Sequence, residues 1–215
     1  MKGSFVSSST VVVGDVSVGT NSSIWYGAVL RGIVGNISLR FKKYIIFVPP
    51  PTHKGDVASV VIGDDVSIGD TAVVGGKSPT KIGNKVVIGS GANVEGSTIE
   101  NGCFIGDGAY VGNGSIIGQQ SLLLSGSYLS PNSTIPSKEI WAGSPAKFIR
   151  AVSVVDIKVI EDLCVQNQTL SSVHACETAK RWEEVELDNF NTEQYEERDR
   201  DVYYRRLTSE VSYVF

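Results

Sequence analysis

Residues 105–135 read IGDGAYVGNGSIIGQQSLLLSGSYLSPNSTI, and an aliphatic residue stands at every sixth position of this stretch. A six-residue period suits a short strand followed by a bend, because a small or turn-forming residue accepts the corner after each aliphatic side chain points inward. Coils of this kind stack and bury one continuous aliphatic column. The stretch therefore predicts a solenoid of hexapeptide repeats. The aliphatic positions are Ile105, Val111, Ile117, Leu123, Leu129 and Ile135.

The same register extends toward the N-terminus, and its density of glycine and β-branched residues argues against a helix. It breaks over residues 40–59 and again over 74–82, where extra residues must leave the coil as loops. Loops are where sites are usually found. We predict an all-β domain over residues 1–150. Its earlier inward positions are Val13, Val18, Ile24, Leu30, Ile62, Ile68, Val74, Ile82, Ile88 and Val94.

The composition changes after Pro145, where glycine disappears and the density of charge rises. Apolar residues then recur at helical spacing, which predicts an amphipathic helix over residues 151–182. The tail, residues 183–215, is charged and rich in aromatic residues, and we expect a partner to order it; a frayed terminus is the alternative. The helical apolar positions are Val154, Ile157, Ile160, Leu163, Cys164, Leu170 and Val173.

Composition excludes several classes of function. The net charge is -4 and no Lys/Arg cluster is interleaved with aromatics, which argues against a nucleic-acid partner. Cys164 and Cys176 would lie roughly 18 Å apart on one helix, too far for a disulfide, so a reducing compartment is expected. The longest apolar run, residues 44–51, is too short to span a bilayer. The N-terminus shows neither a signal nor a transit peptide, so any targeting segment is absent or removed.

Three local strings are more specific than the repeat: SIWYGAVLRG at 23–32, IWAGSPAKFIR at 140–150 and VHACETAK at 173–180. Together they resemble the gamma carbonic anhydrase family. The last string, with the tail behind it, is similar to the branch found as subunits of mitochondrial respiratory complex I. The resemblance covers the chain from about Phe5 onward. It implies a left-handed parallel β-helix that forms a trimer, zinc held by histidines of adjacent subunits, and a C-terminal α-helix packed along the prism.

The resemblance also implies where metal ligands would stand. The family's two histidines spaced five apart correspond here to Asp70 and Gly75, and its remaining ligand corresponds less securely to a position near Val48. His53 lies downstream of that position in a Pro-rich loop, outside the register. Catalytic zinc needs three protein ligands and a bound water. We therefore expect no catalytic residue, no metal and no cofactor, and we expect Asp70 to occupy a turn of the coil.

Arg31 follows the family string, whereas the acidic residue expected two positions later is replaced by Ile33. A charge on a coil of small and aliphatic residues needs a counter-charge or water, so Arg31 is a candidate for the subunit interface or a solvated position. Trp25 and Trp141 are expected to pack, each with its indole N–H satisfied locally.

Three functions follow from these observations. The first is a structural, catalytically inactive subunit in a trimer, expected to be a heterotrimer of homologous chains. That trimer would contact membrane-arm subunits of complex I on the matrix side of the mitochondrial inner membrane, and partner histidines could complete a site at another interface. The second is an active zinc-dependent gamma carbonic anhydrase that uses His53 and Asp70. The third is a hexapeptide acyltransferase, for which His53 is the candidate base.

Overall fold

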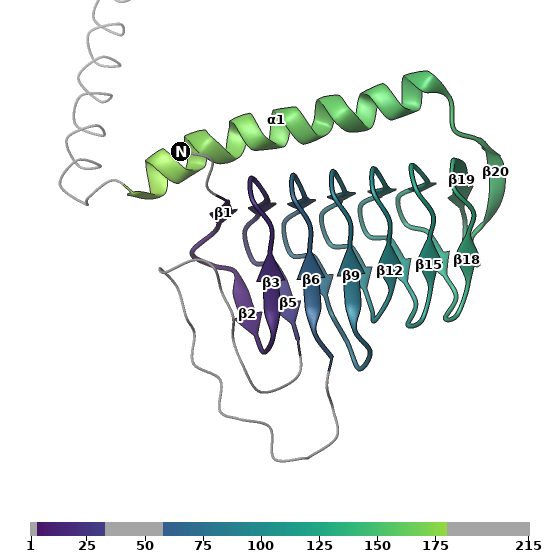
Figure 1. Ribbon diagram of the computed structural model, residues 1–215, viewed down its shortest axis with the longest axis horizontal. Coiled ribbons are helices and arrows are strands. Elements are labelled where there is room, and N and C mark those ends of the chain that lie inside the picture. The colour runs from purple at the N-terminus through teal and green to yellow at the C-terminus, as the bar shows by residue number, and fades with distance from the viewer. Residues whose placement is uncertain (1–3, 33–57, 180–215) are drawn as a thin grey trace, which may run out of the picture. The chain divides into compact units, whose positions relative to one another are not determined.

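The computed structural model describes residues 4–32 and 58–179, which form a parallel β-solenoid followed by one α-helix (Figure 1). Each coil contributes one strand to each of three sheets, here named A, B and C. Sheet A consists of β1 (Phe5–Val6), β4 (Ser23–Ile24), β7 (Ser67–Ile68), β10 (Val87–Ile88), β13 (Phe104–Ile105), β16 (Leu122–Leu123), β19 (Glu139–Ala142) and β20 (Lys147–Ala151).

Sheets B and C have six described strands each, and all of them run parallel. Sheet B consists of β2 (Val11–Val13), β5 (Val29–Arg31), β8 (Val73–Val74), β11 (Asn93–Val94), β14 (Tyr110–Val111) and β17 (Tyr128–Leu129). Sheet C consists of β3 (Val16–Val18), β6 (Val60–Ile62), β9 (Thr80–Ile82), β12 (Thr98–Ile99), β15 (Ile116–Ile117) and β18 (Thr134–Ile135). The predicted fold class, a β-helix of hexapeptide repeats with a C-terminal helix, is confirmed.

The core is the aliphatic column that the six-residue period predicts. All six aliphatic side chains from Ile105 to Ile135 are at most 2% exposed. Strand pairing keeps the column aligned, since Ile105 stands opposite Leu123 in the next coil. Each such side chain gains about 1.5–3 kcal/mol from burial, which offsets the conformational entropy lost in ordering the coil.

The predicted register is wrong at one early position and incomplete at another. Val12, rather than Val13, stands opposite Leu30 and packs against the core. Val12 lies six positions before Val18 and so fits the period, whereas Val13 lies only five before it; the error is therefore in the predicted register and not in the repeat. Ile99, 1% exposed, also joins the column, although it follows the preceding inward residue, Val94, by five positions instead of six.

The second predicted break is confirmed, because residues 75–79 connect β8 to β9 outside the regular coil. Most of the first break, including residues 40–57, lies outside the described residues. Both tryptophans pack as expected. Trp25 is buried and its Nε1 donates to Ser67 Oγ at 3.2 Å, while Trp141 packs against the core and its Nε1 donates to Glu139 Oε2 at 2.8 Å.

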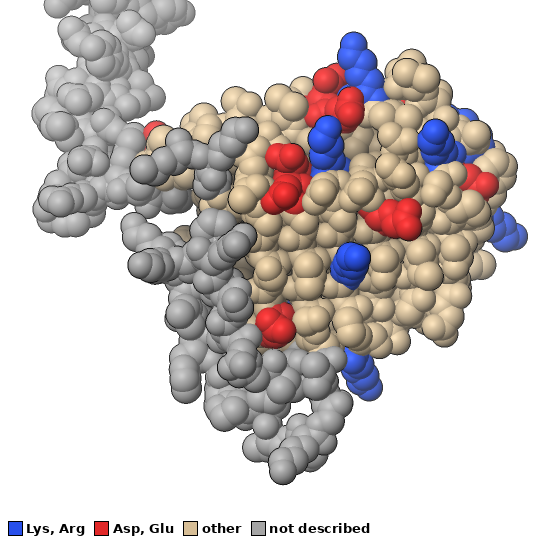
Figure 2. Space-filling model, viewed as in Figure 1, with Lys and Arg blue, Asp and Glu red and all other residues tan. Residues whose placement is uncertain are grey.

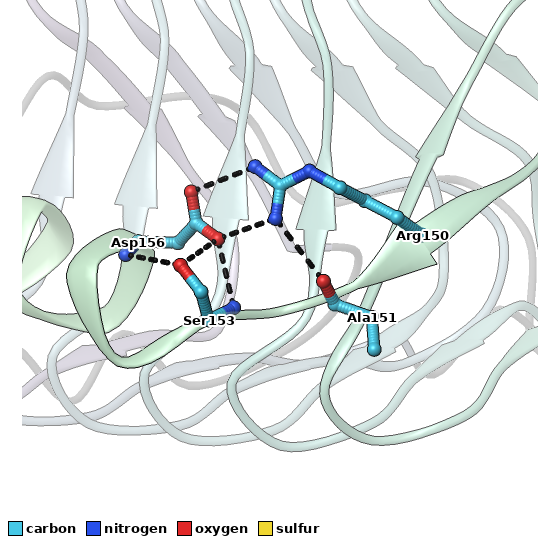
Figure 3. A network of polar contacts seen from close by, with 4 residues as sticks. All are labelled: Arg150, Ala151, Ser153 and Asp156. Atoms are coloured by element: carbon cyan, nitrogen blue, oxygen red, sulfur yellow. Dashed lines mark hydrogen bonds and ion pairs between the residues drawn. The ribbon is translucent and has the colours of Figure 1, made fainter.

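Helix α1 (Val154–Ala179) begins at a capping box. The backbone N–H of Asp156 donates to Ser153 Oγ at 3.3 Å, and Asp156 Oδ2 accepts the backbone N–H of Ser153 at 2.8 Å. Arg150, at the end of β20, donates to both carboxylate oxygens of Asp156, at 2.7 and 3.0 Å (Figure 3). The Arg150 bonds, followed by those from Ser153, lower the pKa of Asp156.

The helix covers the outer face of sheet A. Ile160 and Cys164, 3% and 4% exposed, pack against Val87, Leu122 and Ile140. The predicted apolar face is correct for these helix residues but wrong for three others. Val154, Leu170 and Val173 are 83%, 48% and 54% exposed, because the face that meets the sheet continues through polar residues such as Gln168 and Ser171 instead.

Residues 180–182 of the predicted helix and the whole tail lie outside the described residues. Contacts divide the chain after Ser172, so the β-helix and most of α1 form one compact unit. Within the described ranges no helix is both long and apolar enough to cross a bilayer. In Figure 2 most charged side chains, of both signs, lie toward the side of α1, and the strands below present a largely uncharged surface.

Candidate functional site

Sheet B presents an outward column that α1 does not cover. The strand register places three valines in one half of this column, and polar and aromatic residues in the other half. The two ends of the column are exposed, with Val11 at 38% and Tyr128 at 40%. The two long edges of this face are corners of the coil, which we name the A–B corner and the B–C corner after the sheets that they join. The outward column is Val11, Val29, Val73, Asn93, Tyr110 and Tyr128.

The B–C corner carries two of the predicted site residues. Arg31 and Gly75 occupy equivalent positions in adjacent coils, because Leu30 stands opposite Val74. Gly75 has a φ of +117°, and a Cβ built on it would lie 1.9 Å from the carbonyl oxygen of Arg31. The backbone of the neighbouring coil therefore occupies the space that a side chain at this position would need. The Arg31 side chain is exposed.

Glu95 occupies the next equivalent position of the same corner, because Val94 stands opposite Val74. The carboxylate accepts a hydrogen bond from the hydroxyl of Tyr110. Burial of the Tyr110 ring, followed by this bond and the Glu95 charge, raises the pKa of Tyr110. Tyr110 stacks on Tyr128, with ring centroids 5.1 Å apart and an interplanar angle of 10°. The Glu95 carboxylate thus interacts with Tyr110, one of two stacked tyrosine rings.

Asp70 lies at the opposite, A–B corner. Its Oδ1 accepts the backbone N–H of Tyr26 from the preceding coil at 2.9 Å. The same pattern continues up the corner, where Asp107 Oδ1 accepts the N–H of Ser90 at 2.8 Å and Ser125 Oγ accepts the N–H of Asp107 at 3.2 Å. Asp70 is one member of a ladder that ties each coil to the next.

The structure does not bring Asp70 and Gly75 together, because they stand before and after strand β8. The chain turns at Asp70 and Thr71 and then passes through β8, so these two positions stand at opposite edges of sheet B, whereas zinc ligands lie about 2 Å from the metal. Side chains at these two positions could share an ion only across two subunits. Stacking also repeats the five-residue spacing one coil later, at Ser90 and Glu95. The spacing alone therefore does not decide which coil carries a ligand pair, and sequence reasoning missed Glu95 for that reason.

Curated relatives match most of the chain, although no family model matches it. The mitochondrial gamma carbonic anhydrase 2 of Arabidopsis thaliana is 34% identical over 197 residues, covering 92% of this chain and 66% of the relative. A probable carbonic anhydrase of Methanocaldococcus jannaschii is 33% identical, covering 77% of this chain and 91% of the relative. The chain belongs to the gamma carbonic anhydrase family. It spans 66%, 62% and 66% of the length of the three mitochondrial Arabidopsis gamma carbonic anhydrases that it matches.

Solved structures agree with the fold of this gamma carbonic anhydrase family member. A hexapeptide transferase family protein from Anaplasma phagocytophilum is 30% identical, covers 79% of this chain and 91% of its own, and superposes with a TM-score of 0.62. The N-acyltransferase AntD from Bacillus cereus, 14% identical with a TM-score of 0.53, covers 80% and 88% and shows the fold alone.

The residues at these corners do not fit the zinc of a gamma carbonic anhydrase. Gly75 has no donor side chain and no room for one, the Asp70 carboxylate holds a backbone N–H, and Glu95 holds Tyr110. Within 4–32 and 58–179, no three His, Cys, Asp or Glu residues gather closely enough to hold a metal ion. His53, Val48 and Ile33 lie outside the described residues.

Proposed function

We propose that this chain is a structural member of the gamma carbonic anhydrase family that does not itself catalyse hydration of CO2. The observation that carries the proposal is the B–C corner, where the Arg31 carbonyl occupies the position of a Gly75 side chain. A catalytic zinc needs three protein ligands. If Gly75 is a ligand position, as the resemblance to the family implies, no side chain there could bind the metal unless the Arg31 backbone moved.

The proposal includes a trimer that forms through the sheet B face. Val11, Val29 and Val73 make one half of that face apolar, and Arg31 stands at its corner, beside the valines. Two corners on opposite edges of one sheet would contribute to a common site across a subunit boundary. Arg31 would then meet a carboxylate of the neighbouring subunit. Because this chain offers no ligand set of its own, homologous chains with histidines would complete any active site, which favours a heterotrimer.

The proposed location is the matrix side of the mitochondrial inner membrane, as a peripheral subunit on the membrane arm of complex I. The likeness of residues 173–180 and the tail to the complex I branch supports this assignment, and so do three relatives named as mitochondrial gamma carbonic anhydrases. The proposed partners are homologous gamma carbonic anhydrase-like subunits and complex I membrane-arm subunits.

The test uses two preparations, the native assembly and the chain expressed alone. For each we would identify the components by mass spectrometry, measure zinc, and follow CO2 hydration by stopped flow. We expect the native assembly to contain paralogous chains and respiratory subunits, and the isolated chain to bind no zinc and to hydrate CO2 no faster than buffer. Zinc near one equivalent per chain with hydration activity in the isolated chain would overturn the catalytic part. A native preparation without paralogues or respiratory subunits would overturn the location.

A further inference from the structure

The third corner of the coil, between sheets C and A, carries a ladder of residues in the left-handed conformation. Backbone bonds stack its rungs: the N–H of Gly102 donates to Asn84 O at 2.9 Å, and the N–H of Gln120 donates to Asn101 O at 2.9 Å. Among the described residues, Gly102 is the rung that has no side chain. The rungs and their φ angles are Asn21 (61°), Asp65 (58°), Lys85 (53°), Gly102 (68°), Gln120 (57°) and Lys138 (63°).

Helix α1 runs along this corner and is held by the rungs before Gly102. Gln168 Nε2 donates to Asp65 Oδ1 at 2.8 Å, and Glu161 lies 3.9 Å from the Lys85 ammonium. A cavity of about 270 Å³ opens at the Gly102 rung, between the corner and the helix. The missing side chain thus coincides with a cavity. Its walls include Asn84, Lys85, Asn101, Ile157, Ile160 and Glu161.

The polar wall presents hydrogen-bond donors. Asn84 Oδ1 accepts the backbone N–H of Asp64 at 2.9 Å, and Asn101 Oδ1 accepts the backbone N–H of Asn84 at 2.8 Å. A backbone N–H only donates, so these contacts fix both amide oxygens and turn both Nδ2 groups away as donors. Adjacent coils are about 4.8 Å apart. One ligand oxygen placed between the two amides would lie about 2.9 Å from each, a good hydrogen-bond length.

The remaining walls define the rest of the ligand. Ile157 and Ile160 give the helix side an aliphatic surface, and the Lys85 ammonium adds a positive charge beside the amide donors. Glu161 opposes an anion and lies 3.9 Å from the Lys85 ammonium, so it weakens the attraction of Lys85 for a carboxylate and leaves the two amides as the main donors. We propose that this cavity binds a short aliphatic carboxylate, with the carboxylate on Asn84, Asn101 and Lys85 and the hydrocarbon chain on the two isoleucines. This site is independent of the proposed structural function.

Sodium pentanoate is the probe, and the protein is the full chain with isoleucine methyl groups labelled for NMR. We expect titration to shift the methyl signals of Ile157 and Ile160 with a Kd on the order of 1 mM, as suits a ligand of this size. The cation 1-pentylamine, which has the same number of carbon atoms, should not produce these shifts. Lys85→Gln should weaken pentanoate binding about five-fold, and Glu161→Gln should strengthen it two-fold or more, because a like charge is removed.

A matched pair of glycine variants tests the location. Gly102→Asn should fill the cavity and abolish binding, because asparagine tolerates the left-handed conformation and its Cβ would meet only Gln120 Cγ, at 3.3 Å. Gly108→Asn has a comparable φ of +63° and nothing within 4 Å, so it should bind pentanoate like the natural chain.

Three results would overturn the proposal. The first is the absence of any methyl shift at a pentanoate concentration about ten times the expected Kd. The second is binding of pentylamine as tight as that of pentanoate, and the third is undiminished binding of pentanoate by the Gly102→Asn variant. If Gly102→Asn does not fold, the two charge variants still test the proposal, because Lys85→Gln should weaken pentanoate binding and Glu161→Gln should strengthen it. Both side chains are more than half exposed, so these substitutions leave the core intact. Equal effects of the two charge variants would then refute the carboxylate assignment.

Discussion

A histidine introduced at Gly75 should destabilise the B–C corner. Gly75→His introduces a Cβ where the Arg31 carbonyl oxygen stands 1.9 Å away, at a φ of +117°. Holding a side chain in such a backbone conformation costs about 1–3 kcal/mol, and forcing atoms into a filled space costs a further 1–3 kcal/mol. We therefore expect Gly75→His to lower the free energy of unfolding by about 2–6 kcal/mol.

The assay is urea denaturation followed by circular dichroism, at one fixed protein concentration because assembly would shift the midpoint. Gly126→His is the matched control, since Gly126 has a φ of +67° and nothing within 4 Å of its Cβ position. The control should show only the conformational cost, about 1–2 kcal/mol. If Gly75→His is no less stable than Gly126→His, the backbone at Arg31 can move away from a side chain at position 75 at little cost. The argument that Gly75 closes this ligand position would then be wrong.

Three further predictions concern the core, the thiols and the start of the helix. Ile117→Ala should lower the free energy of unfolding by about 2–5 kcal/mol, because the side chain is fully buried. Its neighbour Ile116, 45% exposed, should lose less than about 1 kcal/mol on the same change, and equal losses would contradict the register. At pH 8 a thiol reagent should label one cysteine of the native chain, the exposed Cys176, and three after denaturation, because burial raises the pKa of the other two thiols to about 11. Rapid labelling of all three in the native state would refute this. Asp156→Asn should destabilise the chain at pH 7, and the difference should shrink as the pH falls below about 4, because bonds from Arg150 lower the folded-state pKa of Asp156, so its contribution is lost on protonation. A difference that is as large at pH 2 as at pH 7 would contradict that origin.

The sequence predicts the β-helix well because its core depends on a local rule. An aliphatic residue every six positions is sufficient to place Ile105 through Ile135 inside, and each is at most 2% exposed. The rule fails where the chain omits a residue, as at Ile99, because only the pairing with the next coil shows where the turn was moved.

The candidate site was harder to predict, because its contacts join different coils. Glu95 and Tyr110 are 15 positions apart and meet because consecutive strands of sheet B stack. A five-residue spacing recurs in each coil, so the sequence could assign Asp70 and Gly75 to a site without showing that they lie at opposite corners. The empty rung at Gly102 likewise becomes visible only when Lys85 and Gln120 are aligned with it.

The separation between core and corners determines which substitutions the fold tolerates. The aliphatic column and the sheet A interface with α1 supply the buried apolar area that stabilises the chain. The corner positions contribute mainly short ladder contacts, such as Asp70 to Tyr26. A corner side chain can therefore be exchanged at little cost in stability where the backbone leaves room for it. At Gly75 the Arg31 carbonyl oxygen occupies that room, so adding a side chain there is costly.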